Sequence, residues 1–310
     1  MALTNLTERV NQKTVEERYC SAKFTQGIHG ELIFLSVVNI CLSISAVLGN
    51  TLILVALNKE TSLHQASKLL YSTLAITDLG VAIIVEPLAV TYWTSVVNEK
   101  WNICYYTHFA RDISAYALSS ISFFTLTAIS FDRLLALTLG LRYRQVVTLK
   151  RTLTSVLVSW VFSSIVASSI FFEIQIILWF AKVGFALGIV TTVFSYTKIF
   201  FTLRQNQIRA LRSDISRWPA TQAIPLNVAR YKKAVYSALW VQLALVICYL
   251  PNNIVVALEI QGEIPLAIYL TRQFTFTLVN LNSSLNPLVY CWKITEVRQA
   301  VKETLRNIFF

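Results

Sequence analysis

Long runs of apolar residues, separated by short polar stretches, follow one another along most of the chain. A helix needs about 20 consecutive apolar residues to cross the roughly 30 Å hydrocarbon core of a bilayer. Stretches of that length give seven predicted spans, at residues 31–57, 68–93, 103–137, 152–172, 174–203, 229–258 and 266–291. The pattern therefore predicts an all-α membrane protein with a seven-helix bundle.

The separation of the fourth and fifth spans depends on length, because only the polar residues Glu173 and Gln175 divide them. A count of six spans is the alternative. Lys and Arg favour seven, because they concentrate in alternate connections and insertion leaves such residues on the cytoplasmic side of short loops. Seven spans place the amino terminus outside the cell and the carboxyl terminus inside, in a multi-pass protein of the plasma membrane.

Composition agrees with a membrane protein. Apolar residues make up 55% of the 310 positions and charged residues 14%, which is too little polar surface for a soluble domain of this size. Lys and Arg outnumber Asp and Glu by 27 to 16. Since this excess lies in the predicted inner segments, it indicates membrane topology and attraction to anionic lipid, and it does not call for nucleic acid as a partner.

Two shorter segments flank the predicted bundle at 31–291. Residues 1–30 are polar and lack the apolar core of a cleavable signal peptide, so we expect a short extracellular tail, in which Asn5 begins an N-glycosylation triplet of a kind that is common by chance. Residues 292–310 place Ile294, Val297, Val301 and Leu305 at spacings of three and four. That spacing predicts an amphipathic helix on the inner membrane surface.

Polar and helix-breaking residues recur inside the spans, where lipid makes them costly. In chain order these markers are Gly49-Asn50, Leu74-Ala75-Ile76-Thr77-Asp78, Asp132-Arg133-Leu134, Trp160, Tyr196, Cys248-Tyr249-Leu250-Pro251 and Asn286-Pro287-Leu288-Val289-Tyr290. Each alone is weak evidence. Their order and depth over nearly the whole chain resemble the rhodopsin-like (class A) family of G-protein-coupled receptors.

The resemblance implies an extracellular ligand bound among the outer helix halves and a heterotrimeric G protein bound at the inner end. The resemblance implies that Arg133 pairs with the neighbouring Asp132 at rest and turns outward on activation. It also implies that Leu141 would insert into the G protein. Tyr196 and Tyr290 would line the inner cleft. Pro251 and the Asn286-Pro287 break would act as hinges.

Asp78 stands near the bilayer centre, where a carboxylate needs water or partners. The resemblance implies a sodium ion held by Asp78 with Asn50, Ser283 and Asn286, which stabilises the resting state. A hydrogen-bonded polar cluster without an ion is the alternative. We expect no other cofactor.

Two regulatory expectations follow from the inner segments. The base of the sixth span reads Arg230-Tyr231-Lys232-Lys233, with no acidic residue to hold Arg133 in a closed state, so we expect ligand-independent signalling. The short segment after the predicted surface helix lacks the usual phosphorylation cluster, so we expect weak arrestin-driven desensitisation.

The chain departs from the family in its cysteines. No cysteine lies between Trp160 and Tyr196, so the usual disulfide to the second extracellular loop cannot form. Cys20 and Cys104 are the extracellular cysteines, and because the outer face is oxidising and they have no competitors, we propose that they form a disulfide, with free thiols as the alternative.

Two further departures concern the fourth and fifth spans. Their connection is nearly absent, and Gly188 stands where the fifth helix of the family usually has a proline. In both respects the chain is similar to the melanocortin, cannabinoid and lysophospholipid receptors.

Candidate ligand-binding residues are the polar side chains of the outer helix halves, together with Tyr249, which stands where the family usually has a tryptophan beneath the pocket. These residues are Glu86, Asp112, Tyr116, Gln175, Lys182, Tyr249, Asn252, Asn253, Gln273 and Asn280.

The ligand itself is left open among peptides, lipids and small molecules. Amine receptors place an aspartate eighteen residues before Arg133, where this chain has Ala115, so a catecholamine-like ligand is disfavoured. Asp112 with Glu86 could receive a basic peptide side chain or a divalent cation, an arrangement that is similar to melanocortin receptors. A salt bridge from Arg111 or Arg272 to Asp112 is the alternative of equal weight.

Other classes of protein fit the sequence less well. Residues 266–291 contain no lysine for a retinal Schiff base, and the sequence shows no nucleophile constellation or phosphate loop, so we expect neither a visual pigment nor an enzyme. A channel or transporter is the main alternative, although it should show repeats, matched broken helices or a ring of charges.

Overall fold

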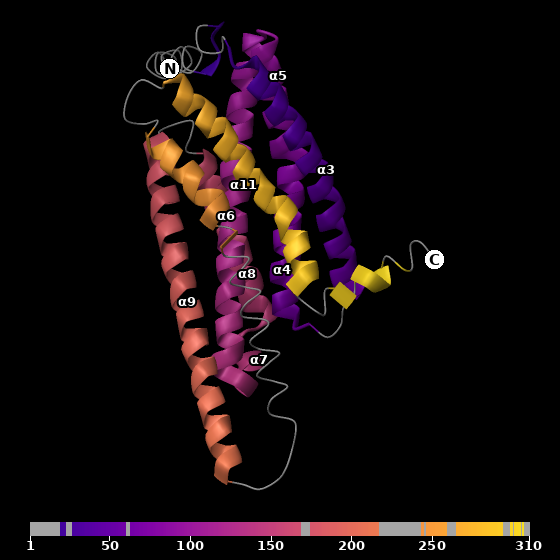
Figure 1. Ribbon diagram of the computed structural model, residues 1–310, viewed down its shortest axis with the longest axis vertical. Coiled ribbons are helices and arrows are strands. Elements are labelled where there is room, and N and C mark those ends of the chain that lie inside the picture. The colour runs from indigo at the N-terminus through magenta and orange to yellow at the C-terminus, as the bar shows by residue number, and fades with distance from the viewer. Residues whose placement is uncertain are drawn as a thin grey trace.

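The computed structural model of the chain describes residues 19–22, 27–59, 63–168, 174–216, 243–244, 246–258, 265–293, 298–299, 301–304 and 306. Within these residues the regular elements are helical and no strand occurs. The helices run along one another in a bundle with α3 and α9 on opposite sides in the view of Figure 1. Their bounds are α3 His29–Lys59, α4 Gln65–Gly80, the π-helical turn η1 Val81–Val85, α5 Glu86–Val97, α6 Trp101–Leu139, the 3-10 turn η2 Gly140–Arg142, α7 Tyr143–Val146, α8 Leu149–Ser168, α9 Ile174–Ser216, a helix at Val246–Leu258 and α11 Leu266–Lys293.

Five helical stretches are long and apolar enough to cross a membrane, counting α4, η1 and α5 as one and searching the described residues only. They are His29–Lys59, Gln65–Val97, Trp101–Leu139, Leu149–Ser168 and Lys182–Thr202. The shorter apolar helix Val246–Leu258 and the 28-residue α11 correspond to the predicted sixth and seventh spans. The predicted all-α membrane fold is therefore confirmed, and the fourth and fifth spans are the separate helices α8 and α9.

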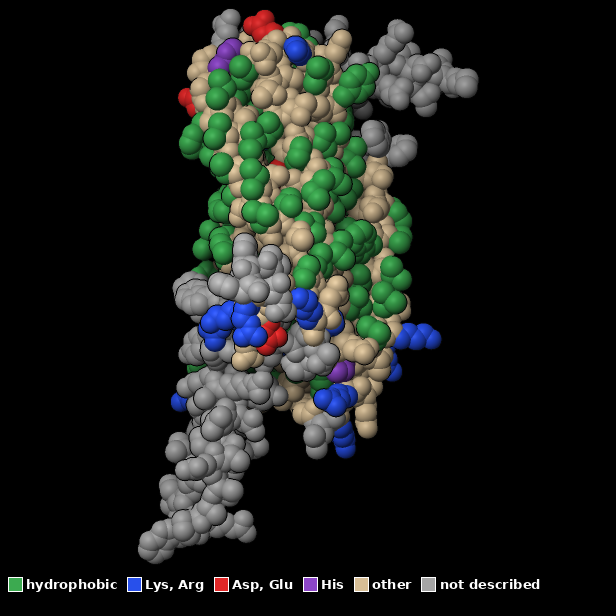
Figure 2. Space-filling model, turned by 90° about the vertical axis from the view of Figure 1, so that its right-hand side faces the viewer, with side chains coloured by type: hydrophobic (Ala, Val, Ile, Leu, Met, Phe, Trp, Pro, Cys, Tyr) green, Lys and Arg blue, Asp and Glu red, His purple; other side chains and the backbone are tan. Residues whose placement is uncertain are grey.

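The outer surface of the bundle has the character that lipid requires. On α3 the side chains of Ile33, Phe34, Val37 and Ile44 are each more than half exposed. In Figure 2 hydrophobic side chains cover the upper and middle part of the visible face, and most of the visible Lys and Arg gather toward the lower end. An apolar belt of this kind identifies a multi-pass membrane protein.

Helix α6 lies at the centre of the packing, because it contacts α4, α5, α8 and α9. Toward the outer end, buried Trp93, Tyr92 and Tyr269 form one apolar cluster with neighbours from α3 and α6. Toward the inner end, a second cluster joins α3, α4 and α6 and includes Val301, which is 6% exposed and belongs to the predicted surface helix. Both clusters hold the long α6 in place.

The π-helical turn η1 interrupts the second predicted span. The backbone N–H of Glu86 donates to the carbonyl of Val81, five residues back. Pro87 follows directly and has no N–H to donate, so the ladder of i to i−4 bonds cannot continue unbroken through this point. On either side of the turn, Asp78 and Glu86 are both fully buried.

Two glycines allow helices to approach closely. A Cβ on Gly49 of α3 would lie 2.9 Å from Cβ and Cγ of Pro287 in α11, so only glycine fits at this contact. A Cβ on Gly188 of α9 would overlap the ring of Phe123 in α6. Gly188, noted in the sequence for the absence of proline, therefore provides the space that an aromatic ring of α6 occupies.

Candidate functional site

A cavity of about 110 Å³ lies among α6, α8, α9, the Val246–Leu258 helix and α11. Its lining is mostly aromatic and apolar, with neutral polar groups from several helices and one acid and one base at its outer end. The lining residues are Asp112, Ala115, Tyr116, Ser119, Ser120, Phe123, Phe124, Phe162, Ser163, Val166, Ala167, Gly184, Phe185, Tyr249, Asn252, Asn253, Arg272, Phe276 and Val279. Such a mixture, apolar with a few polar groups that fix orientation, is typical of sites for small ligands.

The structure brings part of the predicted ligand set to this cavity. Asp112, Tyr116, Tyr249, Asn252 and Asn253 line it. Four predicted residues, Glu86, Lys182, Gln273 and Asn280, do not line it, and the side chain of Gln175 lies outside the described residues. The glycosylation candidate Asn5 also lies outside them.

The residues that do not line the cavity have other places in the bundle. Gln273 accepts hydrogen bonds from Trp93 Nε1 at 3.0 Å and Arg111 Nη1 at 3.1 Å, and Asn280 donates to Asn39 Oδ1 at 2.9 Å. Both carboxylate oxygens of Glu86 are buried, with no hydrogen-bond partner among the described residues.

Sequence reasoning missed the phenylalanines of the lining, namely Phe123, Phe124, Phe162, Phe185 and Phe276. A signal was present on α6, where residues 112, 115, 116, 119, 120 and 123 repeat at spacings of three and four and thus share one helix face. Extending that face from Asp112 would have found Phe123.

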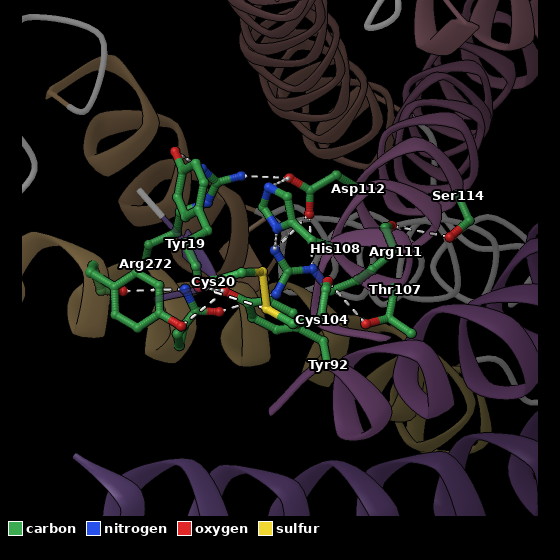
Figure 3. Close-up of polar contacts among 12 residues, drawn as sticks. Tyr19, Cys20, Tyr92, Cys104, Thr107, His108, Arg111, Asp112, Ser114 and Arg272 are labelled. Atoms are coloured by element: carbon green, nitrogen blue, oxygen red, sulfur yellow. Dashed lines mark hydrogen bonds and ion pairs between the residues drawn. A yellow bond between two sulfur atoms is a disulfide. The ribbon is translucent and has the colours of Figure 1, made fainter. Parts of the chain in front are cut away.

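Asp112 is held by two arginines (Figure 3). Its Oδ1 accepts from Arg111 Nε at 2.8 Å, and its Oδ2 accepts from Arg272 Nη2 at 2.8 Å. His108 Nε2 lies 3.9 Å from the same Oδ2. The structure therefore shows the salt-bridge alternative at Asp112. The hypothesis that Asp112 and Glu86 jointly receive a basic side chain or a divalent cation stays a prediction.

Of the two arginines, Arg111 is the more deeply buried and is 1% exposed. Its guanidinium carbon lies 4.3 Å from the ring centre of Tyr92 and 4.8 Å from that of Phe276. Its Nη2 lies 3.1 Å from His108 Nδ1. Aromatic faces and hydrogen bonds therefore stabilise a guanidinium that has left water.

The amino-terminal tail is tied to this cluster by a disulfide between Cys20 and Cys104, the pairing that the sequence proposed. Beside it, the ring of Tyr19 stacks on His108 with centroids 4.6 Å apart. Arg272 Nη1 donates to the Tyr19 hydroxyl at 3.4 Å, a long contact. Figure 3 shows the disulfide and Tyr19 next to the Asp112 cluster, so the tail borders the outer end of the cavity.

Asp78 lies deeper in the bundle and is fully buried. Its Oδ2 accepts from Asn286 Nδ2 at 2.8 Å, and Asn50 Nδ2 donates to the carbonyl of Ser283 at 3.0 Å. Asp78 Oδ1 and Asn50 Oδ1 are buried without a hydrogen-bond partner among the described residues. The four predicted residues therefore meet where α3, α4 and α11 adjoin, with two oxygens that a cation could use.

Asp132 and Arg133 form the inner site at the end of α6. Arg133 Nη2 lies 3.1 Å from Asp132 Oδ2, and the same carboxylate accepts from the Tyr143 hydroxyl at 2.6 Å and from Ser67 Oγ at 2.9 Å. Burial, followed by the hydrogen bond to Asp132, raises the pKa of Tyr143 to about 12, so this hydroxyl keeps its proton and donates at any physiological pH.

The remaining coupling residues are described only in part. Pro251 lies within the Val246–Leu258 helix and Pro287 lies inside α11. The side chains of Leu141, Tyr196 and Tyr290, and all of residues 230–233, lie outside the described residues.

Comparison with known proteins finds similarity to receptors. Residues 49–176 match the 7 transmembrane receptor (rhodopsin family). Galanin receptor 2a of Danio rerio is 25% identical over 90% of this chain and 80% of its own length. Probable G-protein coupled receptor 45 of Homo sapiens is 23% identical over 89% of this chain and 83% of its own, and adenosine receptor A3 of Ovis aries is 25% identical over 84% and 86%.

These similarities and the helical fold support a G-protein-coupled receptor of the rhodopsin family. They do not favour the channel or transporter alternative. The matched proteins are receptors rather than enzymes.

Proposed function

We propose that this chain is a plasma-membrane receptor that binds an extracellular ligand in the cavity among α6, α8, α9 and α11, and that activates a heterotrimeric G protein at the Asp132 and Arg133 end of α6. One observation carries the proposal: the 39-residue helix α6 lines the cavity from Asp112 to Phe124 and also holds the Asp132 and Arg133 ion pair. A ligand that favours one packing of α6 and its neighbours thereby biases the inner end.

The proposed orientation has the amino terminus outside. The disulfide between Cys20 and Cys104 supports it, because such bonds persist on the oxidising side of the membrane. The Lys and Arg side chains at the opposite end of the bundle support the same orientation, because such residues stay on the cytoplasmic side.

We propose a sodium ion at Asp78 as a modulator of the resting state. Asp78 Oδ1 and Asn50 Oδ1 support this, because hard cations prefer oxygen ligands and buried oxygens without a partner are costly.

The melanocortin, cannabinoid and lysophospholipid subgroup also remains a proposal, supported by the position of Gly188, whereas the relatives named above carry other names.

The experiment that tests the receptor function needs no ligand. We would measure cyclic AMP and calcium in cells that express the wild type or Arg133→Ala at equal surface level. We expect a basal output that exceeds that of mock-transfected cells and that Arg133→Ala removes, because the guanidinium is the group that would meet the G protein. A basal output that Arg133→Ala leaves unchanged would contradict the proposed coupling site.

A further inference from the structure

The two charged residues among the described lining of the cavity, Asp112 and Arg272, are already paired with each other. Arg272 Nη2 donates to Asp112 Oδ2 at 2.8 Å, and Arg111 Nε donates to the other carboxylate oxygen at 2.8 Å. A ligand of either charge would have to compete with this buried ion pair, whereas an uncharged ligand leaves the pair in place. The charges at the outer end of the cavity therefore favour a neutral ligand.

Two asparagines of the sixth predicted span bring neutral polar groups to the same cavity. Asn253 Nδ2 donates to the carbonyl of Tyr249 at 2.9 Å, which leaves Asn253 Oδ1 as an acceptor with no partner among the described residues. Thr275 Oγ1 shares its proton between Asn252 Oδ1 at 3.3 Å and the carbonyl of Arg272 at 3.1 Å. The donors on Asn252 Nδ2 are then left for a ligand, so neighbouring residues offer one neutral donor group and one neutral acceptor.

Aromatic rings lie next to the two asparagines. Tyr249 precedes Asn252 and Asn253 by three and four residues, a spacing that places side chains on one helix face, and all three line the cavity. The ring centroid of Phe123 in α6 lies 6.2 Å from that of Tyr249 and 5.3 Å from that of Phe185 in α9. A flat ring that is hydrogen-bonded to the asparagines would therefore meet aromatic walls.

The cavity is small. Its volume of about 110 Å³ is comparable with that of an apolar cavity of roughly 150 Å³ that holds benzene. A space of this size has room for one ring with few substituents, and it has no room for a whole lipid or a whole peptide. Of the ligand classes that the sequence leaves open, the volume favours a small molecule.

We propose that the cavity takes an uncharged heteroaromatic ring that contains an amide, whose N–H donates to Asn253 Oδ1 and whose carbonyl accepts from Asn252 Nδ2. The inference rests on the proposed receptor function, and it names the chemical class of the ligand. A ring amide fits because it carries a donor and an acceptor on neighbouring atoms of a flat ring and has no net charge. Analogues that lack one of these groups leave an asparagine unpaired, which weakens their binding.

The test uses single-ring probes: 2-pyridone, 1-methyl-2-pyridone, benzene, and the charged benzoate and benzylammonium. Surface plasmon resonance measures dissociation constants on the full-length receptor in immobilised phosphatidylcholine nanodiscs, and empty nanodiscs provide the reference that removes partition into lipid. We expect 2-pyridone to bind at least about fivefold more tightly than 1-methyl-2-pyridone, which has no N–H, and than benzene. Both charged probes should bind more weakly than 2-pyridone.

Variants locate the effect. Asn253→Leu should weaken 2-pyridone to the level of 1-methyl-2-pyridone and leave the methylated probe unchanged, because that probe has no N–H to donate. Asn252→Leu should weaken both pyridones, since both present a carbonyl, and unchanged benzene binding shows that the cavity is folded. Asn98→Leu is the matched control, because Asn98 Nδ2 also donates to a carbonyl four residues back, that of Thr94, and does not line the cavity.

Several outcomes would overturn the proposal: equal affinity for the two pyridones, tighter binding of a charged probe, a preference for 2-pyridone that survives Asn253→Leu, or no binding of any probe at millimolar concentration. The order of the probes on the wild type decides the question even where a variant does not fold. Basal output from the same receptor, with and without Arg133→Ala, is measured in parallel. If that output depends on Arg133 while the preference for 2-pyridone is absent, the receptor function stands and the ligand class falls.

Discussion

Asp78 combines complete burial with a carboxylate oxygen that has no hydrogen-bond partner among the described residues. If sodium fills that place, it binds the folded receptor only, and at ten times its dissociation constant it adds about 1.4 kcal/mol to the stability. We expect the unfolding midpoint of the purified wild type to rise when sodium replaces choline, and we expect this rise to vanish in Asp78→Asn.

Glu86→Gln is the matched control for this experiment, because Glu86 is also a fully buried carboxylate but lies beyond the η1 turn. Its sodium response should equal that of the wild type. A rise that persists in Asp78→Asn would sink the ion site, and a wild type that ignores sodium would favour the hydrogen-bonded cluster without an ion.

Among individual residues, the sequence predicted the polar residues that line the cavity better than the apolar ones. Asp112, Tyr116 and Asn252 were found because polar groups in lipid need partners. Phe162 and Phe185 were not, because an aromatic residue that faces lipid and one that faces a cavity look alike in a sequence. The pairing of Asp112 with Arg272 was left as an alternative. These two residues are 160 positions apart in the sequence, and their contact depends on how α6 packs near α11.

Among the elements, the contact between α3 and α11 makes the sharpest prediction. Gly49→Ala places a methyl group 2.9 Å from the ring carbons of Pro287, so the helices must separate. We expect a loss of about 1–3 kcal/mol of stability, as for overpacked cores, measured as a lower unfolding midpoint.

Gly30→Ala provides the control within the same helix, because a Cβ there meets nothing within 4 Å. It should leave the midpoint unchanged or raise it slightly, since alanine favours helix by about 0.5–1 kcal/mol over glycine. Equal effects of the two substitutions would mean that the close approach of α3 and α11 does not contribute to stability.

The helices themselves were largely predictable, because a run of apolar residues of membrane length has few other interpretations. The bounds of α3 and α6 extend the predicted spans by two residues at each end, and α11 extends its span by two residues at the carboxyl end. The η1 turn was not predicted, because hydropathy carries no information about which carbonyl each N–H meets. Pro87 was the available signal, and it was not used.

For the molecule as a whole, the two proposed sites lie far apart. Asp112 and Arg133 are 21 residues apart on one helix, which is about 30 Å at 1.5 Å per residue. No side chain can join them, so a ligand must act by favouring one of two arrangements of the bundle.

The disulfide also affects the molecule as a whole, because it joins two residues with a sequence separation of 84. Removing it through Cys20→Ala or Cys104→Ala should lower the stability by about 2–4 kcal/mol, because the unfolded chain regains freedom. The unfolding midpoint measures the loss, and mass mapping after alkylation without reduction should find neither cysteine modified in the wild type.

Cys41→Ala is the matched cysteine control, because Cys41 is an exposed free thiol of α3. It should have little effect on the midpoint. A wild type in which Cys20 and Cys104 both react with the alkylating agent before reduction would dispose of the bridge.

The η1 turn also sets how this receptor tolerates changes in length. The π-helical turn holds one residue more than an α-helical turn, so the loss of one residue between Val81 and Val85 would let a regular helix form and would keep the residues after it on nearly the same faces. Glu86, Tyr92 and Trp93, all fully buried now, would then stay inside the bundle, whereas the loss of one residue from the regular part of α5 would turn the residues after it by about 100°. Ile83, which is 61% exposed, is the residue of this turn whose loss removes least from the core, so this short stretch can tolerate a change in length that a regular helix cannot.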